Sequence, residues 1–399
     1  MINASATGWI DKFLALEGPL LEADNISDAT FYRSIRSTGF IYGHIIAFDT
    51  QRPVETKGWT SEEISKVALL HTLYRVFRRV TSENSTPLFV EKAVSFYREM
   101  HPAGFNLFRR VLPENPPSHD LEKMIGERVQ TNDNIISKNF SHIVTNALLF
   151  EDVLAFQQFL LHGAIPHNYL KKLEETIVSI VSLALNAKMN PSKYDELLTK
   201  LFEASVRFTK FSKVKVQDLE NLQLDYFGNT LEKYYLLDMA GLALWNDAIM
   251  EEMEASFLYT LAELMKVPDE FVAESIASAD DFIQTNKKHI PYFNYSNPVK
   301  HFYDQATQTV VVLITRNKKR LLKEISQSGE LMVLLALSAK RDLNEKEKKK
   351  VKKQLLEICK TIPSLTIFLL PGGSLLLPIL IKFIPKMLPS VFNENLEQE

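Results

Sequence analysis

Lysine side chains are the most concentrated chemical feature of this chain, and they crowd one stretch near its C-terminal end. Six of them fall within residues 345–353: Lys346, Lys348, Lys349, Lys350, Lys352 and Lys353. Ammonium groups at this density bind phosphates, either those of a nucleic acid or those of anionic lipid head groups. A run of lysines is also the ordinary composition of a solvated helix face. The spacing alone leaves both interpretations open.

Patterns that would support catalysis are absent from the sequence. It has no glycine-rich phosphate loop, no GxSxG elbow, no HExxH pair and no Cys–His cluster. We therefore expect no enzyme, no cofactor and no small-molecule substrate. The single cysteine, Cys359, excludes an intramolecular disulfide and fits a reducing compartment.

An uncharged stretch follows the lysines. Residues 361–381 carry no ionisable side chain, and Lys382 follows directly. As a helix, this stretch would be about 31 Å long at about 1.5 Å per residue, which is close to the hydrocarbon thickness of a bilayer. It therefore predicts a membrane segment and makes membrane lipids an expected partner.

Prolines and glycines interrupt this segment. The residues expected to shape it are Pro363, Pro371, Gly372, Gly373, Ser374, Pro378, Pro385 and Pro389. Each proline removes a backbone hydrogen bond, which is tolerated at membrane depth only where neighbouring protein or a water-lined cavity compensates. We therefore expect the segment to pack against copies of itself, in a homo-oligomer, or against a partner. Whether it spans or re-enters is left open, and two buried core helices of about ten residues are an alternative.

The rest of the chain has the periodicity of helices. Only 13 of 399 residues are glycine, and apolar residues recur at three-to-four spacing within 169–186, 231–245 and 252–265. Asn344 and Glu347 form a capping box that predicts a helix over 345–360. The expected fold is all-α, a multi-helix body followed by a proline-kinked, membrane-associated helical segment. Linker-like runs divide the chain into residues 1–117, a central 118–290 and a C-terminal 299–399.

The C-terminal residues resemble a known family. Residues 343–392 combine the run Leu343–Lys349 (LNEKEKK), the spaced prolines and the run Met387–Phe392 (MLPSVF). This pattern resembles the leucine-zipper/EF-hand transmembrane (Letm) family. The resemblance implies ribosome binding at a membrane and a part in cation homeostasis. Residues 236–272 are similar to the TerB-like tellurite-resistance family. This resemblance implies weak candidates for a cation site, with Asp247 at the acidic position and Glu251 or Glu254 as its partner.

These observations together predict a non-enzymatic, membrane-anchored protein whose lysines contact the phosphates of a ribosome. Two alternatives are a subunit of a proton-coupled cation exchanger and a membrane-tethered helical scaffold. Lysines before the uncharged stretch and an acidic tail after it place the N-terminal body in the cytoplasm. The N-terminal residues have neither a signal-peptide nor a transit-peptide pattern, so the expected location is a bacterial inner membrane.

Overall fold

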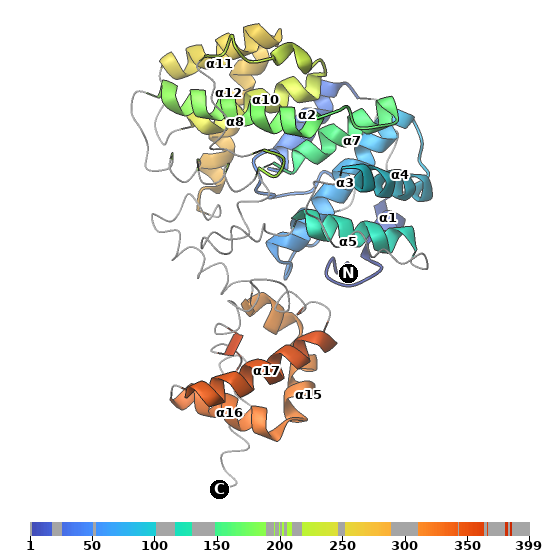
Figure 1. Cartoon of the computed structure of the whole chain (residues 1–399), viewed down its shortest axis with the longest axis vertical. Helices are drawn as coiled ribbons and strands as arrows, with labels where there is room; N and C mark the ends of the chain where they lie inside the picture. The colour runs from blue at the N-terminus through green and yellow to red at the C-terminus, as the bar shows by residue number, and fades with distance from the viewer. Residues whose placement is uncertain are drawn as a thin grey trace. The chain divides into compact units, whose positions relative to one another are not determined.

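Helices are the regular secondary structure among the residues that the computed structural model describes (Figure 1). It describes residues 2–17, 26–50, 53–100, 116–129, 148–188, 206–209, 218–245, 252–288, 310–341 and 343–362, and the single positions 195, 199, 202, 365, 380, 381 and 384. No strand occurs among these residues. The predicted all-α class is therefore confirmed for this part of the chain.

The helices follow one another in chain order, with short connections between several of them. They are α1 (Trp9–Glu17), α2 (Asp28–Ser37), α3 (Ser61–Thr81), α4 (Thr86–Glu99), α5 (Pro117–Val129), α7 (Phe150–His162), α8 (Tyr169–Ala187), η4 (Leu224–Tyr226), α10 (Thr230–Leu244), α11 (Glu252–Met265), α12 (Asp269–Asn286), α15 (Lys318–Ser326), α16 (Gly329–Lys340) and α17 (Glu345–Thr361).

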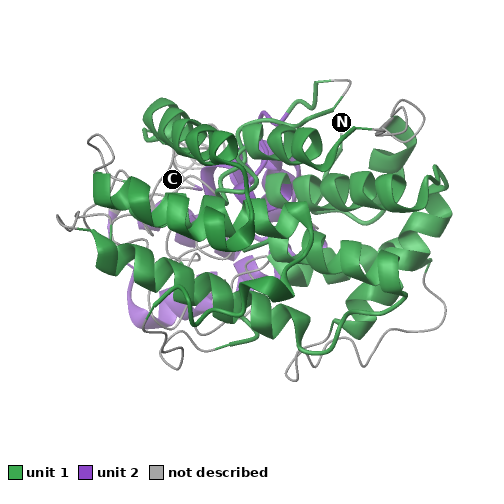
Figure 2. Cartoon of the chain, turned by 90° about the horizontal axis from the view of Figure 1, so that it is seen from above, with its two compact units in different colours: residues 1–55, 64–132, 142–296 green, residues 56–63, 133–141, 297–399 purple. Residues whose placement is uncertain are grey.

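The helices divide into two compact units, coloured separately in Figure 2. The first unit comprises residues 1–55, 64–132 and 142–296, and the second comprises residues 56–63, 133–141 and 297–399. Arg316 donates to the Glu63 carboxylate at 2.8 Å and ties residues 56–63 to the second unit. The three regions expected from linker-like runs stay a prediction.

Helix α10 is the centre of the first unit. Every residue from Tyr234 to Leu244 on this helix is buried, which is the pattern of a helix surrounded by protein on all sides. It packs against α2, α8, α11 and α12. A capping box starts it, because Asn229 accepts from the backbone of the first turn and Glu232 accepts from the Asn229 amide at 3.0 Å.

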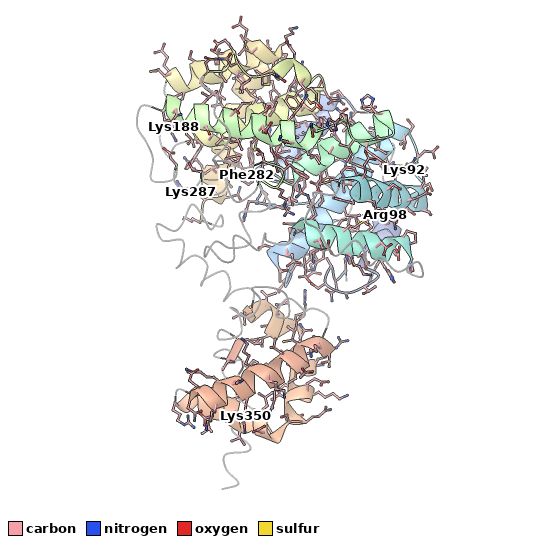
Figure 3. All side chains as sticks on the ribbon, viewed as in Figure 1. Lys92, Arg98, Lys188, Phe282, Lys287 and Lys350 are labelled. Atoms are coloured by element: carbon pink, nitrogen blue, oxygen red, sulfur yellow. The ribbon has the colours of Figure 1, made fainter. Side chains whose placement is uncertain are left out.

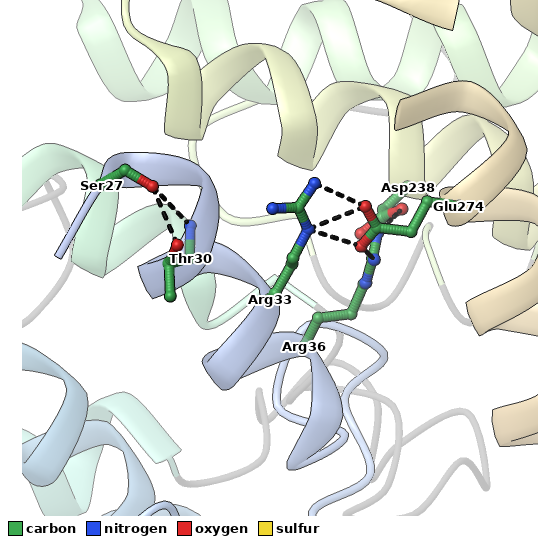
Figure 4. A network of polar contacts seen from close by, with 6 residues as sticks. All are labelled: Ser27, Thr30, Arg33, Arg36, Asp238 and Glu274. Carbon is green, nitrogen blue, oxygen red and sulfur yellow. Dashed lines mark hydrogen bonds and ion pairs between the residues drawn. The ribbon is translucent and has the colours of Figure 1, made fainter. Parts of the chain in front are cut away.

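A buried polar network fastens α2 to α10 and α12 (Figure 4). The Asp238 carboxylate on α10 is fully buried and accepts hydrogen bonds from Tyr32 Oη at 2.8 Å and from Ser275 Oγ. Arg36 on α2 bridges Asp238 and Glu274. A buried carboxylate is tolerated when it is paired and hydrogen-bonded in this way. Burial nevertheless raises the pKa of Asp238.

A second buried network joins α4, α5, α7 and α8 in the same unit. Arg128 donates from Nε to both carboxylate oxygens of Asp152 at 2.7 Å, and Tyr97 Oη donates to Asp152 at 3.1 Å. Glu174 accepts from the backbone amides of residues 207–209 at 2.6–2.8 Å. Within the described part of the chain, neither carboxyl oxygen of the fully buried Glu151 has a hydrogen-bond partner.

The second unit has its own hydrophobic core. Apolar side chains from residues 310–314 and from α15, α16 and α17 meet there. Helix α17 contributes the fully buried side chains of Val351 and Leu355 to this core, and the buried Cys359 lies on the same side of the helix. Burial raises the pKa of the Cys359 thiol to about 12, so this cysteine is an inert packing residue at neutral pH.

Candidate functional site: the basic face of helix α17

Helix α17 begins where its sequence predicts. The Asn344 side chain accepts from the Glu347 amide at 2.9 Å, and the Glu347 carboxylate accepts from the Asn344 amide at 2.8 Å. Arg341 holds the same carboxylate through two further hydrogen bonds, at 2.9 and 2.7 Å. The bonded Arg341 guanidinium lowers the pKa of Glu347 to about 2, so this cap stays charged. The capping box is confirmed, and it fixes the start of the lysine-bearing helix.

The two faces of α17 differ in composition. Val351, Leu355 and Ile358 recur at three-to-four spacing and are buried against α15 and α16. All six predicted lysines are exposed: Lys346, Lys348, Lys349, Lys350, Lys352 and Lys353. The buried stripe anchors the helix, so the ammonium groups are carried on a fixed backbone.

Two of these lysines already have acidic partners. Lys348 pairs with Glu345 at 2.9 Å. Lys350, which is labelled in Figure 3, pairs with Glu330 on α16 at 2.6 Å. Gln354 donates to the second Glu330 oxygen at 2.7 Å and orients that acid. Glu330 was not expected from the sequence, because it lies 20 residues before Lys350 and only the tertiary fold brings them together.

The other four lysines form the cationic surface that we call the α17 basic face: Lys346, Lys349, Lys352 and Lys353. In the part of the chain that the structure describes, none of their ammonium groups forms an ion pair. An exposed cation with no acidic partner keeps its full charge available to an anion. This face is therefore suited to bind a polyanion.

The structure describes the uncharged stretch after α17 at residues 361, 362, 365, 380 and 381. Leu365 and Leu380 of this stretch, and Ile384 just beyond it, are completely buried in the core of the second unit, and Ile381 packs against that core. In the described part of the chain, no helix combines the length and the apolarity that a bilayer crossing requires. All eight residues expected to shape the segment, from Pro363 to Pro389, lie outside the described residues.

Because these side chains are buried, a substitution at Leu380 tests whether it lies in the protein core. We expect Leu380→Ala to lower the free energy of unfolding of the second unit by about 2–4 kcal/mol in aqueous buffer, because it leaves a cavity in a packed core. Urea unfolding followed by circular dichroism would measure the change. Val333→Ala, at a side chain that is 59% exposed on α16, is the control. An unchanged stability for Leu380→Ala would contradict the core position.

The predicted metal site gains no support. Asp247 and Glu251 lie outside the described residues, and Glu254 is a buried residue of α11. No group of acids, histidines and cysteines that could hold a metal ion occurs within the described ranges. Sequence reasoning missed three buried acids of the first unit, Asp238, Glu151 and Glu174, because each lies within a helical apolar pattern. The hydrogen-bond partners of Asp238 and Glu174 are also far away in sequence.

Comparison with known proteins bears on one end of the chain. Residues 343–399, about a seventh of its length, match the family described as LETM1-like, RBD. This range includes α17 and its basic face. No curated protein and no solved structure matches the chain, and the TerB-like resemblance of residues 236–272 stays unsupported. The Letm resemblance is thus confirmed for the C-terminal segment, because residues 343–399 are similar to the LETM1-like family.

Proposed function

We propose that the second unit binds ribosomes through the α17 basic face. The observation that carries this proposal is the coincidence of two independent facts. The matched family is described as an RBD, a ribosome-binding domain, and the matched residues present four exposed lysines without acidic partners. The role is one of binding rather than catalysis.

The physical basis is electrostatic. Each lysine that neutralises a phosphate releases condensed counterions, and the affinity then falls steeply as salt is added. The α17 basic face adds preorganisation, since its helix is capped at Asn344 and held on the core by Val351 and Leu355. The flexible lysine stems still have to be ordered on binding, but the backbone does not.

Neutralising the α17 basic face should therefore make the affinity for ribosomes less dependent on salt. For the variant K346Q/K349Q/K352Q/K353Q, we expect the negative slope of log affinity against log salt to become shallower by about three. This figure corresponds to about 0.7–0.9 for each of the four lost phosphate contacts. Co-sedimentation of the full chain with purified ribosomes between 50 and 300 mM potassium chloride measures this slope. The matched control is K92Q/K123Q/K171Q/K287Q, which removes four exposed lysines from the first unit.

Equal slopes for the two variants would overturn the α17 basic face as the contact surface. Absence of co-sedimentation by the unaltered chain at 50 mM salt would overturn ribosome binding itself.

The other two predicted roles, the exchanger subunit and the membrane scaffold, both need residues 361–381 in lipid. Burial of Leu365 and Leu380 in a protein core favours neither role. Placement at a bacterial inner membrane, contact with lipids and self-association stay predictions of the sequence.

A further inference from the structure

Helix α15 carries a second group of cations, outside the residues that match the family. Its nine residues include Lys318, Lys319, Arg320 and Lys323, and all four side chains are exposed. We call them the α15 basic face. The opposite side of the helix holds Leu321 and Ile325, which are buried in the core of the second unit. Helix α15 is therefore anchored in the same way as α17.

The four cations of the α15 basic face have no acidic partners. None of their side chains forms an ion pair or a hydrogen bond within the described part of the chain. The first turn of the helix contains no acid, and the one acid of the helix, Glu324, is half-buried. By contrast, α17 neutralises part of its charge, since Lys348, Lys350 and Lys360 each pair with a glutamate.

The arrangement also places like charges side by side. Lys319 and Lys323 are four residues apart, and Arg320 and Lys323 are three apart, so each pair lies on one helix face. Like charges at these spacings repel and destabilise a helix. A bound polyanion would remove that repulsion, whereas an uncharged or cationic partner would not.

The composition of the face favours RNA over a lipid surface. A helix that binds a membrane interface inserts an apolar side into the acyl boundary. The apolar side of α15 is already used by the protein core, and no exposed large hydrophobic residue lies on α15. The Arg320 guanidinium adds a planar donor group that matches a phosphate through two hydrogen bonds.

We propose that the α15 basic face is a second RNA-contact surface of the second unit, and that it contacts the phosphate backbone without reading sequence. This inference rests on the proposed ribosome binding and deepens it, because it names RNA as the component that is bound. It also extends the binding surface to a helix that precedes the family match.

The test compares three full-length variants. These are the α15 variant K318Q/K319Q/R320Q/K323Q, the α17 variant described above, and the first-unit control K92Q/K123Q/K171Q/K287Q. Fluorescence anisotropy with a labelled 30-nucleotide RNA hairpin of arbitrary sequence measures affinity as a function of salt. Co-sedimentation with ribosomes and flotation with vesicles of anionic phosphatidylglycerol and neutral phosphatidylcholine complete the set. Circular dichroism confirms that each variant is folded.

We expect the α15 variant to bind the RNA hairpin at least tenfold more weakly than the control at 100 mM salt. Its negative slope of log affinity against log salt should be shallower than that of the control by about three. An α15 variant that binds RNA like the control, while the α17 variant is defective, would overturn the inference and leave the proposed function standing. Loss of vesicle binding without loss of RNA binding would assign the face to lipid instead. Failure of the unaltered chain to bind ribosomes, with RNA binding intact and dependent on α15, would overturn the proposed function alone.

Discussion

Asp152→Ala is expected to lower the free energy of unfolding of the first unit by about 3–5 kcal/mol, the range found when one partner of a buried ion pair is removed. The Asp152 carboxylate is completely buried and receives Arg128 Nε at 2.7 Å and Tyr97 Oη at 3.1 Å. Its removal leaves the buried Arg128 guanidinium without its carboxylate partner. It also breaks the polar contact that Tyr97 of α4, Arg128 of α5 and Asp152 of α7 share.

Urea unfolding at pH 7, followed by circular dichroism, measures this effect. Asp281→Ala, at an exposed position of α12, is the control and should change stability by less than about 0.5 kcal/mol. The double replacement R128M/D152L should recover most of the loss, because an apolar pair of similar volume needs no desolvation compensation. A loss below about 1 kcal/mol for Asp152→Ala would mean that water reaches this network.

The second large effect is a dependence of stability on pH. Burial raises the pKa of Glu174 to about 7, from an ordinary value of 4.5, against the three backbone amides that favour its charged form. Burial also raises the pKa of Glu151 well above its ordinary value, and the neighbouring Glu174 charge adds to that increase. Arg128, Arg207 and Asp152 are the other charged groups around the pair.

The sign follows from proton binding. Between pH 4.5 and about 7, the folded chain holds a proton on Glu174 that the unfolded chain has released, so stability falls as the pH rises. One such carboxyl changes stability by about 1.4 kcal/mol per pH unit, or roughly 3 kcal/mol across this window. The stabilising contribution is complete below pH 4.5 and is gone above about pH 7.

The substitution Glu151→Met tests the Glu151–Glu174 pair by removing the Glu151 carboxyl. The substitution replaces a buried acid that has no hydrogen-bond partner among the described residues. We therefore expect it to stabilise the chain by about 1–3 kcal/mol at pH 8 and to make the pH profile shallower. Urea unfolding at pH 5.5, 6.5, 7.5 and 8.5 measures both effects. Glu220→Gln, at an exposed glutamate, should leave the profile unchanged. A parent profile that is flat over this range would contradict the assignment.

The features that sequence patterns predicted correctly are local. The capping box of Asn344 and Glu347 spans four residues, and the buried stripe of Val351 and Leu355 repeats every helical turn. Both depend only on the geometry of one helix, so the α17 basic face followed from them. The all-α class followed in the same way from apolar periodicity.

The features that sequence patterns missed depend on distant partners. Tyr32 and Asp238 are 206 residues apart, and Arg128 and Asp152 belong to different helices. For the uncharged stretch at 361–381, length and apolarity do not distinguish a bilayer from a protein core, so its placement in lipid stays a prediction. Leu365 and Leu380 show that the core of the second unit provides the apolar surroundings at these two positions.

Four other helices enclose α10, and this limits which amino-acid substitutions the core of the first unit can accept. A side chain that gains or loses a methylene between Tyr234 and Leu244 has no route to solvent, so the misfit must be absorbed by α2, α8, α11 or α12. Substitutions in this core are therefore tolerated mainly in compensating sets. Exposed loops and the two lysine-bearing faces of the second unit are free of that constraint, and they can change charge one residue at a time.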